Sequence, residues 1–267
     1  IYGSDDQHYF MDGIGGADNF TKSGFPREDT DIYANRISRI WDDGVESEGA
    51  NCNVRIWGNF LDNTFTGVSS AANSVGPLYI FRNVTNVGRR LGIGTSNGTL
   101  DTEDRGPFNK CGSNTPAANG GRASLFHNTV LEPTQTGFNN PRGLEGGIID
   151  NGGVLQNVVS RNNIWQSAYS GKGGIGVAEY QSGSGAGCTY DYDLWNFAPS
   201  LQQGVAGSHV ISGTPSYADG APPLVGYNAG PRATGYALAA TSKGHNAGVV
   251  LPNFNDGFFG SAPDVGA

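Results

Sequence analysis

Four segments of the chain share one pattern, and each ends in an asparagine. Every segment has small or apolar residues five and three positions before the asparagine, and an aromatic residue two positions before it. The first three asparagines are 24 residues apart and the fourth follows after 45. A fifth copy lies within 158–164, where either of two adjacent asparagines fits the pattern. The four segments are Thr30–Asn35, Val54–Asn59, Leu78–Asn83 and Ala123–Asn128.

The repeat predicts an all-β solenoid. Alternate residues of a strand point to one side, so the positions five and three before the asparagine fill a core. Each asparagine then occupies an inward turn, where stacked side-chain amides bond to one another and to bend backbone. Coincidental turn asparagines would leave the shared aromatic and aliphatic positions unexplained. Internal repeats of this length are typical of stacked coils.

Two further groups of short apolar segments predict three strands per coil. A second strand follows the asparagine turn, as in 36–38, 60–62 and 129–131, and a third follows a short bend, as in 44–46 and 67–69. We expect one domain over 1–267, with an N-terminal cover (1–28), repeat coils (29–200) and a C-terminal closing segment (201–267). Segments rich in Gly, Asn, Ser and Thr are expected to leave the coils as loops, at 86–107, 132–157 and 168–188.

The composition limits the classes of partner and the fold classes that this chain can have. The formal net charge is −8 and no basic run occurs, so a nucleic-acid surface is not expected. No apolar run approaches the ~18 residues of a membrane span. The 43 glycines and four lysines favour a turn-dense β architecture over long helices.

Several segments together resemble the bacterial right-handed parallel β-helix repeat proteins of the pectate-lyase-like superfamily. The resemblance implies a right-handed parallel β-helix in a secreted or cell-surface protein. It also implies a polysaccharide partner, because the superfamily includes lyases, glycoside hydrolases, uronan epimerases, phage tailspikes and adhesins. The resemblance is carried by 31–49, 53–59, 76–83, 126–129, 161–165, 190–195 and the tail segments 244–248 and 262–267.

The densest acidic cluster contains Asp42, Asp43, Glu46 and Glu48. Four carboxylates within seven residues predict a Ca²⁺ site, since Ca²⁺ takes several oxygen ligands. Asp43 and Glu46 are alternatively the acid and base of a glycosidase. A solvated bend, in which aspartates cap their own backbone, is the structural alternative.

Lys110 is the candidate base of a lyase, which must remove a proton next to a uronate carboxylate and stabilise the resulting anion. Arg89 and Arg90 in the neighbouring loop are the candidate substrate-binding cations. The alternative is that the Lys110 stem covers apolar surface.

Arg82 and His127 occupy equivalent positions next to the turn asparagines of neighbouring coils. Histidine acts as an acid or base near neutral pH, so both residues are catalytic candidates. The alternative is that His127 only forms hydrogen bonds within the turn.

The aromatic positions of the repeat are predicted to form one outward column at coil spacing. If the column is open to solvent, sugar rings can stack on it. Four exposed aromatic side chains would, however, form a large hydrophobic surface patch. We therefore also expect that the segment 1–28 or a loop packs over it. The column consists of Tyr33, Trp57, Phe81 and Phe126.

Together these features predict a secreted protein that binds a polysaccharide and, if it is an enzyme, resembles a polysaccharide lyase more than a glycoside hydrolase. The alternative is a structural or adhesive module of the filament or tailspike kind, which associates through its ends or faces.

Overall fold

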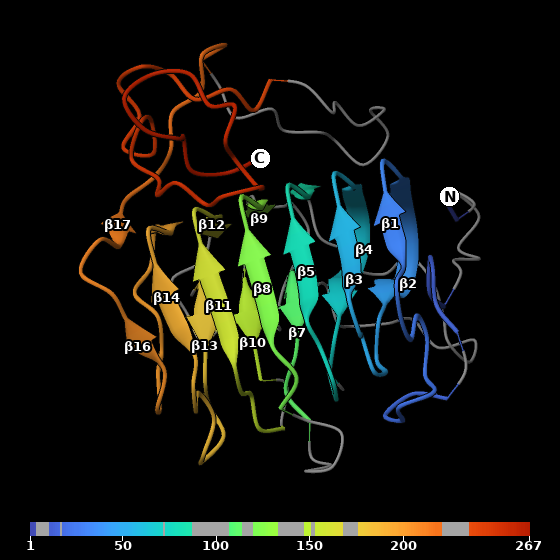
Figure 1. Cartoon of the computed structure of the whole chain (residues 1–267). Helices are drawn as coiled ribbons and strands as arrows, with labels where there is room; N and C mark the ends of the chain where they lie inside the picture. The colour runs from blue at the N-terminus through green and yellow to red at the C-terminus, as the bar shows by residue number, and fades with distance from the viewer. Residues whose placement is uncertain are drawn as a thin grey trace, which may run out of the picture.

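The fold was established from a computed structural model that describes residues 1–3, 11–16, 18–71, 73–86, 107–113, 120–132, 147–150, 153–167, 176–220 and 235–267. These residues form strands, turns and irregular segments, without a helix. Within them, accordingly, no helix has the length and apolarity to cross a membrane. The strands form two curled sheets whose neighbours run parallel (Figure 1), an arrangement that agrees with the predicted solenoid.

The first sheet collects one strand from each coil, and its strands pair in the order in which the chain visits them. Because every pair is parallel, each coil returns to the same side before the next strand begins. In spatial order the seven strands are β1 (Asp31–Tyr33), β3 (Val54–Trp57), β5 (Leu78–Phe81), β8 (Ala123–Phe126), β11 (Val158–Arg161), β14 (Thr189–Asp191) and β16 (Val205–Ala206).

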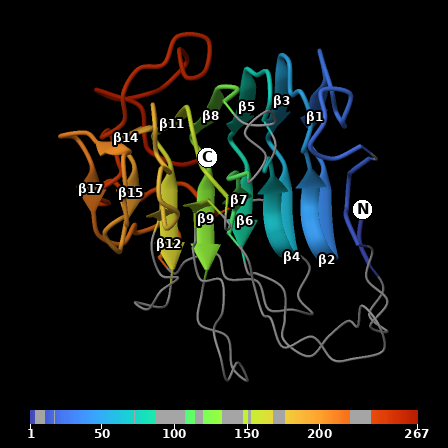
Figure 2. The same ribbon diagram turned by 90° about the horizontal axis from the view of Figure 1, so that it is seen from below.

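The ten-stranded sheet holds the second strands of the coils (Figure 2) and the third strands (Figure 1). In the first two coils these strands are continuous: β2 (Arg36–Glu46) pairs along most of its length with β4 (Phe60–Ser69), and the register shifts between Ile40 and Asp43. The start of β4 then pairs with β6, and its end pairs with β7. The remaining strands are β6 (Val84–Asn86), β7 (Asn109–Lys110), β9 (Thr129–Glu132), β10 (Ile148–Ile149), β12 (Ile164–Ser167), β13 (Val177–Ala178), β15 (Leu194–Trp195) and β17 (Ile211–Ser212).

Two of the predicted loops contain strands, which corrects the sequence interpretation. β10 lies within 132–157 and β13 within 168–188, and both continue the column of third strands that runs through the ends of β2 and β4 to β7. Their apolar side chains are buried although each strand has only two residues. The segments 87–106, 133–146 and 168–175 lie outside the described residues.

The register confirms the alignment of the repeat. Tyr33 pairs with Trp57, Trp57 with Phe81, and Phe81 with Phe126. Phe126 pairs with Arg161, so Asn163 is the turn asparagine of the fifth copy. Arg161 pairs in turn with Asp191, which places Asp193 in the same position of a sixth coil.

The turn asparagines form a continuous hydrogen-bonded ladder. Each side-chain Nδ2 donates to the Oδ1 of the next coil, over 3.1 Å from Asn35 to Asn59, 2.9 Å from Asn59 to Asn83, and 3.1 Å from Asn83 to Asn128. The Nδ2 groups of Asn59 and Asn83 also donate to the carbonyls of Ile32 and Ile56. Stacked amides thus satisfy backbone groups that the sheets do not reach.

The residue before each ladder position has left-handed backbone geometry. Its φ is 54° at Ala34, 61° at Gly58, 52° at Arg82, 53° at His127 and 59° at Asn162. This conformation produces the tight bend that turns the chain from the first sheet into the second. Only glycine adopts it without strain.

The core lies between the sheets, at the positions that the repeat predicts. Ile56, Ile80 and Leu125, each three residues before a ladder asparagine, are fully buried. The N-terminal segment lies against the first coil through three parallel bridges, Tyr2–Ser38, Ile14–Val45 and Glu28–Cys52. The C-terminal segment returns along the carboxyl ends of the strands of the first sheet (Figure 1).

Candidate functional site

The outward face of the seven-stranded sheet carries the predicted aromatic column. The Tyr33 and Trp57 rings are stacked with centroids 4.6 Å apart and planes 3° apart. Trp57 and Phe81 continue the stack at 5.7 Å and 7°. Tyr33 is 52% exposed, and among the described residues no strand pairs with the outer edge of β1. One end of the column is therefore open to solvent.

Asp31 fixes the open end of the column. Its carboxylate accepts hydrogen bonds from Arg55 Nε at 2.7 Å and Arg55 Nη2 at 2.6 Å, which is a bidentate pair. Trp57 Nε1 donates to the same carboxylate at 3.0 Å. The bond from Arg55 lowers the pKa of Asp31, and the bond from Trp57 acts in the same direction. The indole is thereby held in one orientation.

The other end of the column is covered by the C-terminal segment. Phe254 packs edge-on against Phe81 at 5.2 Å and against Phe126 at 5.0 Å. The cover expected from the sequence thus exists, but it comes from the C-terminal segment and extends over only part of the column. Phe254 itself carried no repeat signal that would have identified it.

His127 holds the same C-terminal segment over the turn. Its Nδ1 lies 3.1 Å from the Gly266 carbonyl, while its Nε2 lies 2.8 Å from Asn255 Nδ2 and 3.1 Å from Asn162 Nδ2. Burial lowers the pKa of His127 to about 4, so the ring is neutral at neutral pH. With both ring nitrogens engaged, this geometry favours the turn interpretation over the catalytic one.

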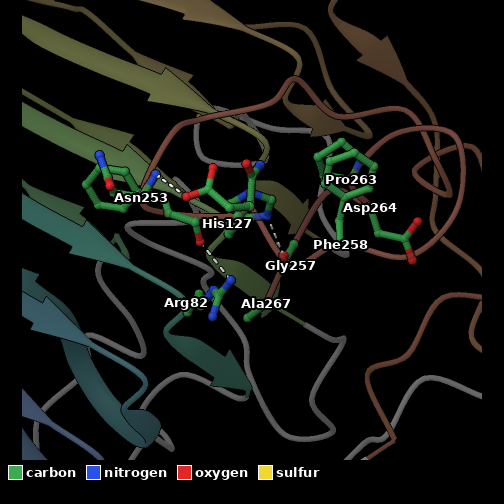
Figure 3. A pocket seen from close by; sticks show the side chains of 12 residues that line it. Arg82, His127, Asn253, Gly257, Phe258, Pro263, Asp264 and Ala267 are labelled. Carbon is green, nitrogen blue, oxygen red and sulfur yellow. Dashed lines mark hydrogen bonds between the residues drawn. The ribbon is translucent and has the colours of Figure 1, made fainter.

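Arg82 and His127 line a pocket of about 650 Å³ between the turn and the C-terminal segment (Figure 3). Arg82 Nη2 donates to the Phe254 carbonyl at 2.7 Å. The two residues that the sequence predicts to be equivalent thus do lie on one surface. Both bind the backbone of the segment that covers them.

The acidic cluster lies on the ten-stranded sheet, apart from the aromatic column. Lys110 Nζ is 3.1 Å from Asp43 Oδ2 and 3.3 Å from Glu48 Oε1. Ser69 donates a hydrogen bond to the same Glu48 oxygen. Burial by itself would lower the pKa of Lys110, but Asp43 and Glu48 outweigh it and raise that pKa above its usual range. Lys110 therefore stays protonated, which does not suit a general base.

Burial also raises the pKa values of Asp43 and Glu46 in this cluster. It raises the pKa of Asp43 to about 7, although the Lys110 charge opposes the shift. Burial likewise raises the pKa of Glu46, whose Oε1 accepts a hydrogen bond from Asn19 Nδ2 at 2.6 Å. The carboxylates of the predicted acid/base pair are thus tied to structural partners.

The structure divides the predicted metal ligands into two groups. Carboxylate oxygens of Asp43, Glu46 and Glu48 lie within 4.8 Å of one another, and so do those of Asp42, Asp43 and Asp12. Asp12 was not identified from the sequence, because it is far from the cluster along the chain. The bridge between Ile14 and Val45 brings it there. Arg89 and Arg90, the predicted substrate-binding cations, lie outside the described residues.

An exposed histidine that the sequence did not single out pairs with the continuation of the aromatic column. His209 Nδ1 is 3.0 Å from Asp191 Oδ2, and the His209 ring stacks on Tyr192 at 4.4 Å. Asp191 holds the position that aromatic residues occupy in earlier coils.

Searches of protein-family models, curated proteins and solved structures found no match to this chain.

Proposed function

We propose that the chain is a right-handed parallel β-helix that binds an extracellular polysaccharide on the outward face of its seven-stranded sheet. The observation that carries the proposal is the rigid Tyr33–Trp57 stack with one end exposed. Aromatic faces provide large contact area at low entropic cost, and binding sites combine them with a few fixed polar groups.

A sugar ring that stacks on the free face of Tyr33 extends the column by one member. The stacking distance of 4.6 Å is close to the strand spacing, so the next ring position is already set by the solenoid. Asp31 lies two residues before Tyr33 on the same face of β1 and, with Arg55 bound to it, offers hydrogen-bonding groups to sugar hydroxyls. Because Asp31 pairs with Trp57 and Arg55, these groups are in place before a ligand arrives.

Neutral sugars fit this face better than uronates. Arg55 Nε and Nη2 are both engaged by Asp31, so the guanidinium charge is already neutralised. The whole chain carries a formal charge of −8, which repels a polyanion over longer distances. We therefore place neutral polysaccharides first among the ligands to be tested.

The proposal is binding, without cleavage. Lys110 is protonated, paired with two carboxylates, and located on the other sheet. At the aromatic face, Asp31 is held by Arg55 and its pKa is lowered, so it is a poor general acid.

Glycan-array screening followed by calorimetry tests this function. Tyr33→Ala and Trp57→Ala are each expected to weaken binding roughly tenfold, the effect of losing ~1.4 kcal/mol of aromatic contact. Tyr2→Ala is the matched control, because Tyr2 is an exposed aromatic residue outside the column. Failure to bind any neutral or acidic glycan, or unchanged binding by Tyr33→Ala, would overturn the proposal.

A second candidate function, end-to-end assembly, rests on the last coil. Both residues of β16 are exposed, Val205 to 60%, and no described strand pairs with the outer edge of β16. Unprotected edges of this kind can pair with another chain. Assembly predicts a concentration-dependent mass in light scattering that Val205→Lys abolishes. A monomer at every concentration would exclude it.

A further inference from the structure

Three carboxylates from two separate segments converge beside the first coil. Asp42 and Asp43 belong to β2, while Asp12 comes from the N-terminal segment that runs alongside it. Their oxygen atoms lie within 4.8 Å of one another. The Asp43 backbone N–H donates to Asp12 Oδ1 at 3.3 Å, which fixes the approach of the two segments.

One buried oxygen in this group has no hydrogen-bond partner in the part of the chain that the structure describes. Asp43 is only 1% exposed, and its Oδ2 is bound by Lys110, but its Oδ1 is left without a donor. Thr66, the partner of Asp43 in the parallel register, is fully buried, and its Oγ1 also lacks a partner. Register partners on parallel strands project to the same side of the sheet. Buried polar atoms of this kind normally have a partner, which can be an ion.

Among the described residues, the carboxylates around the triad outnumber the cations that the contacts bring to it. Lys110 engages Asp43 Oδ2 and is shared with Glu48, and Asn19 engages Glu46. Asp12 and Asp42 add two further carboxylates beside Asp43. Burial and the neighbouring charge of Asp42 raise the pKa of Asp43, and burial raises that of Asp12. Among the described residues, the titratable groups at this place are Asp12, Asp42, Asp43, Glu46, Glu48 and Lys110.

We infer that Asp12, Asp42 and Asp43 bind a divalent cation of the calcium type, which fastens the N-terminal segment to the first coil. All of the donors are oxygens, which disfavours zinc and copper and suits a hard cation. The irregular set of carboxylates, with a hydroxyl nearby, fits the variable coordination of Ca²⁺ better than the strict octahedron of Mg²⁺. The site is independent of glycan binding, since it lies on the other sheet.

Thermal unfolding of the full chain with CaCl₂ and with EDTA tests the inference. A Ca²⁺ concentration about 100-fold above Kd should raise the melting temperature by roughly 5–10 °C. Asp12→Asn and Asp43→Asn should remove this response. Asp12→Asn is the safer variant, because Asp12 is only partly buried and its loss should leave the coil intact. Equilibrium dialysis should find a single Ca²⁺ per chain, and far less binding by Asp12→Asn.

Two further variants make the result decisive. Asp62→Asn removes a buried carboxylate of the same sheet outside the cluster and should keep the full calcium response. Lys110→Met removes the neighbouring ammonium and should strengthen calcium binding. The inference fails if the parent melts alike in calcium and EDTA, or if only Lys110→Met responds. The latter result would show that the Lys110 ammonium, and not a metal ion, neutralises the cluster in the parent protein.

Discussion

Asn163 Nδ2 donates a hydrogen bond to Asp193 Oδ1 across 2.9 Å, so the amide ladder ends on a carboxylate. Asp193 also accepts from the Asn163 backbone N–H at 2.8 Å and from Ser160 Oγ. An ionised aspartate only accepts hydrogen bonds, so it closes the ladder without needing an acceptor in a further coil. Because Asp193 is fully buried, its ionisation makes the stability of the fold depend on pH.

Stability should fall as the pH rises from about 4 to above 6. Burial raises the pKa of Asp193 from its ordinary value of 3.8 to about 6, so in this range the folded state holds a proton that the unfolded chain has released. The stabilisation is present below this window and is lost as the pH passes the folded pKa. The loss amounts to about 3 kcal/mol at most. Urea unfolding across this range measures it.

Asp193→Asn provides the control for that pH dependence. An amide can still accept from Asn163 through its oxygen and donate to Ser160 Oγ through its nitrogen. We expect the variant to fold and to show a flatter pH profile than the parent. An unchanged slope would assign the effect to other carboxylates, such as Asp62, whose pKa burial also raises to about 6.

Asn59→Leu should destabilise the fold by about 2–5 kcal/mol. The substitution removes the acceptor for the Asn35 side chain and backbone, and the donors to Ile32 O and Asn83 Oδ1, in a site that is 2% exposed. Asn35→Leu, at the partly exposed end of the ladder, should cost less. Equal denaturation midpoints for the two variants would contradict the ladder as a source of stability.

Gly58→Ala should cost about 1–2 kcal/mol through backbone strain alone. A Cβ at Gly58 would meet no atom within 4 Å, so the φ of 61° is the only penalty. The reverse change, Ala34→Gly at φ 54°, should be neutral or slightly stabilising, because relief of strain offsets the greater freedom of the unfolded chain. Chemical denaturation compares the pair, and a neutral Gly58→Ala would refute the strain argument.

Phe254→Ala should loosen the C-terminal segment while leaving the sheets folded. The change removes the ring contacts to Phe81, Phe126 and Tyr79, whereas the buried apolar cluster of the described residues does not include Phe254. Limited proteolysis read by mass spectrometry should show faster cleavage near 250–260 with unchanged far-ultraviolet circular dichroism. Protection equal to that of the parent would show that the hydrogen bonds from His127, Arg82 and Asn162 hold the segment without the ring contacts.

The register of the first coils was predictable from sequence in both sheets, because side-chain alternation and the turn asparagines repeat together. Pairing of Tyr33 with Trp57 and of Val45 with Val68 follows directly from the 24-residue and 23-residue intervals. In the fifth copy, two adjacent asparagines satisfied the same pattern. Only the pairing of Arg161 with Phe126 resolves the choice in favour of Asn163.

Features that depend on contacts outside the repeat were not predictable. The strands β10 and β13 have two residues each, too few for any alternation to be visible, and their glycine-rich surroundings indicated loops. Asp12 and Phe254 come from irregular segments at opposite ends of the chain, and their positions depend on bridges and ring contacts that no local pattern encodes.

The parallel register has a consequence for how such a chain can change in length. Val54 pairs with Leu78, and the residues that precede them occupy equivalent places in successive coils. Excising residues 54–77 would join Asn53 to Leu78 with the strand, the left-handed turn and the ladder amide all in phase. Duplicating the same stretch would add one complete coil. The gene could therefore shorten or lengthen the molecule by whole periods, with the two ends and the C-terminal cover left to absorb the mismatch.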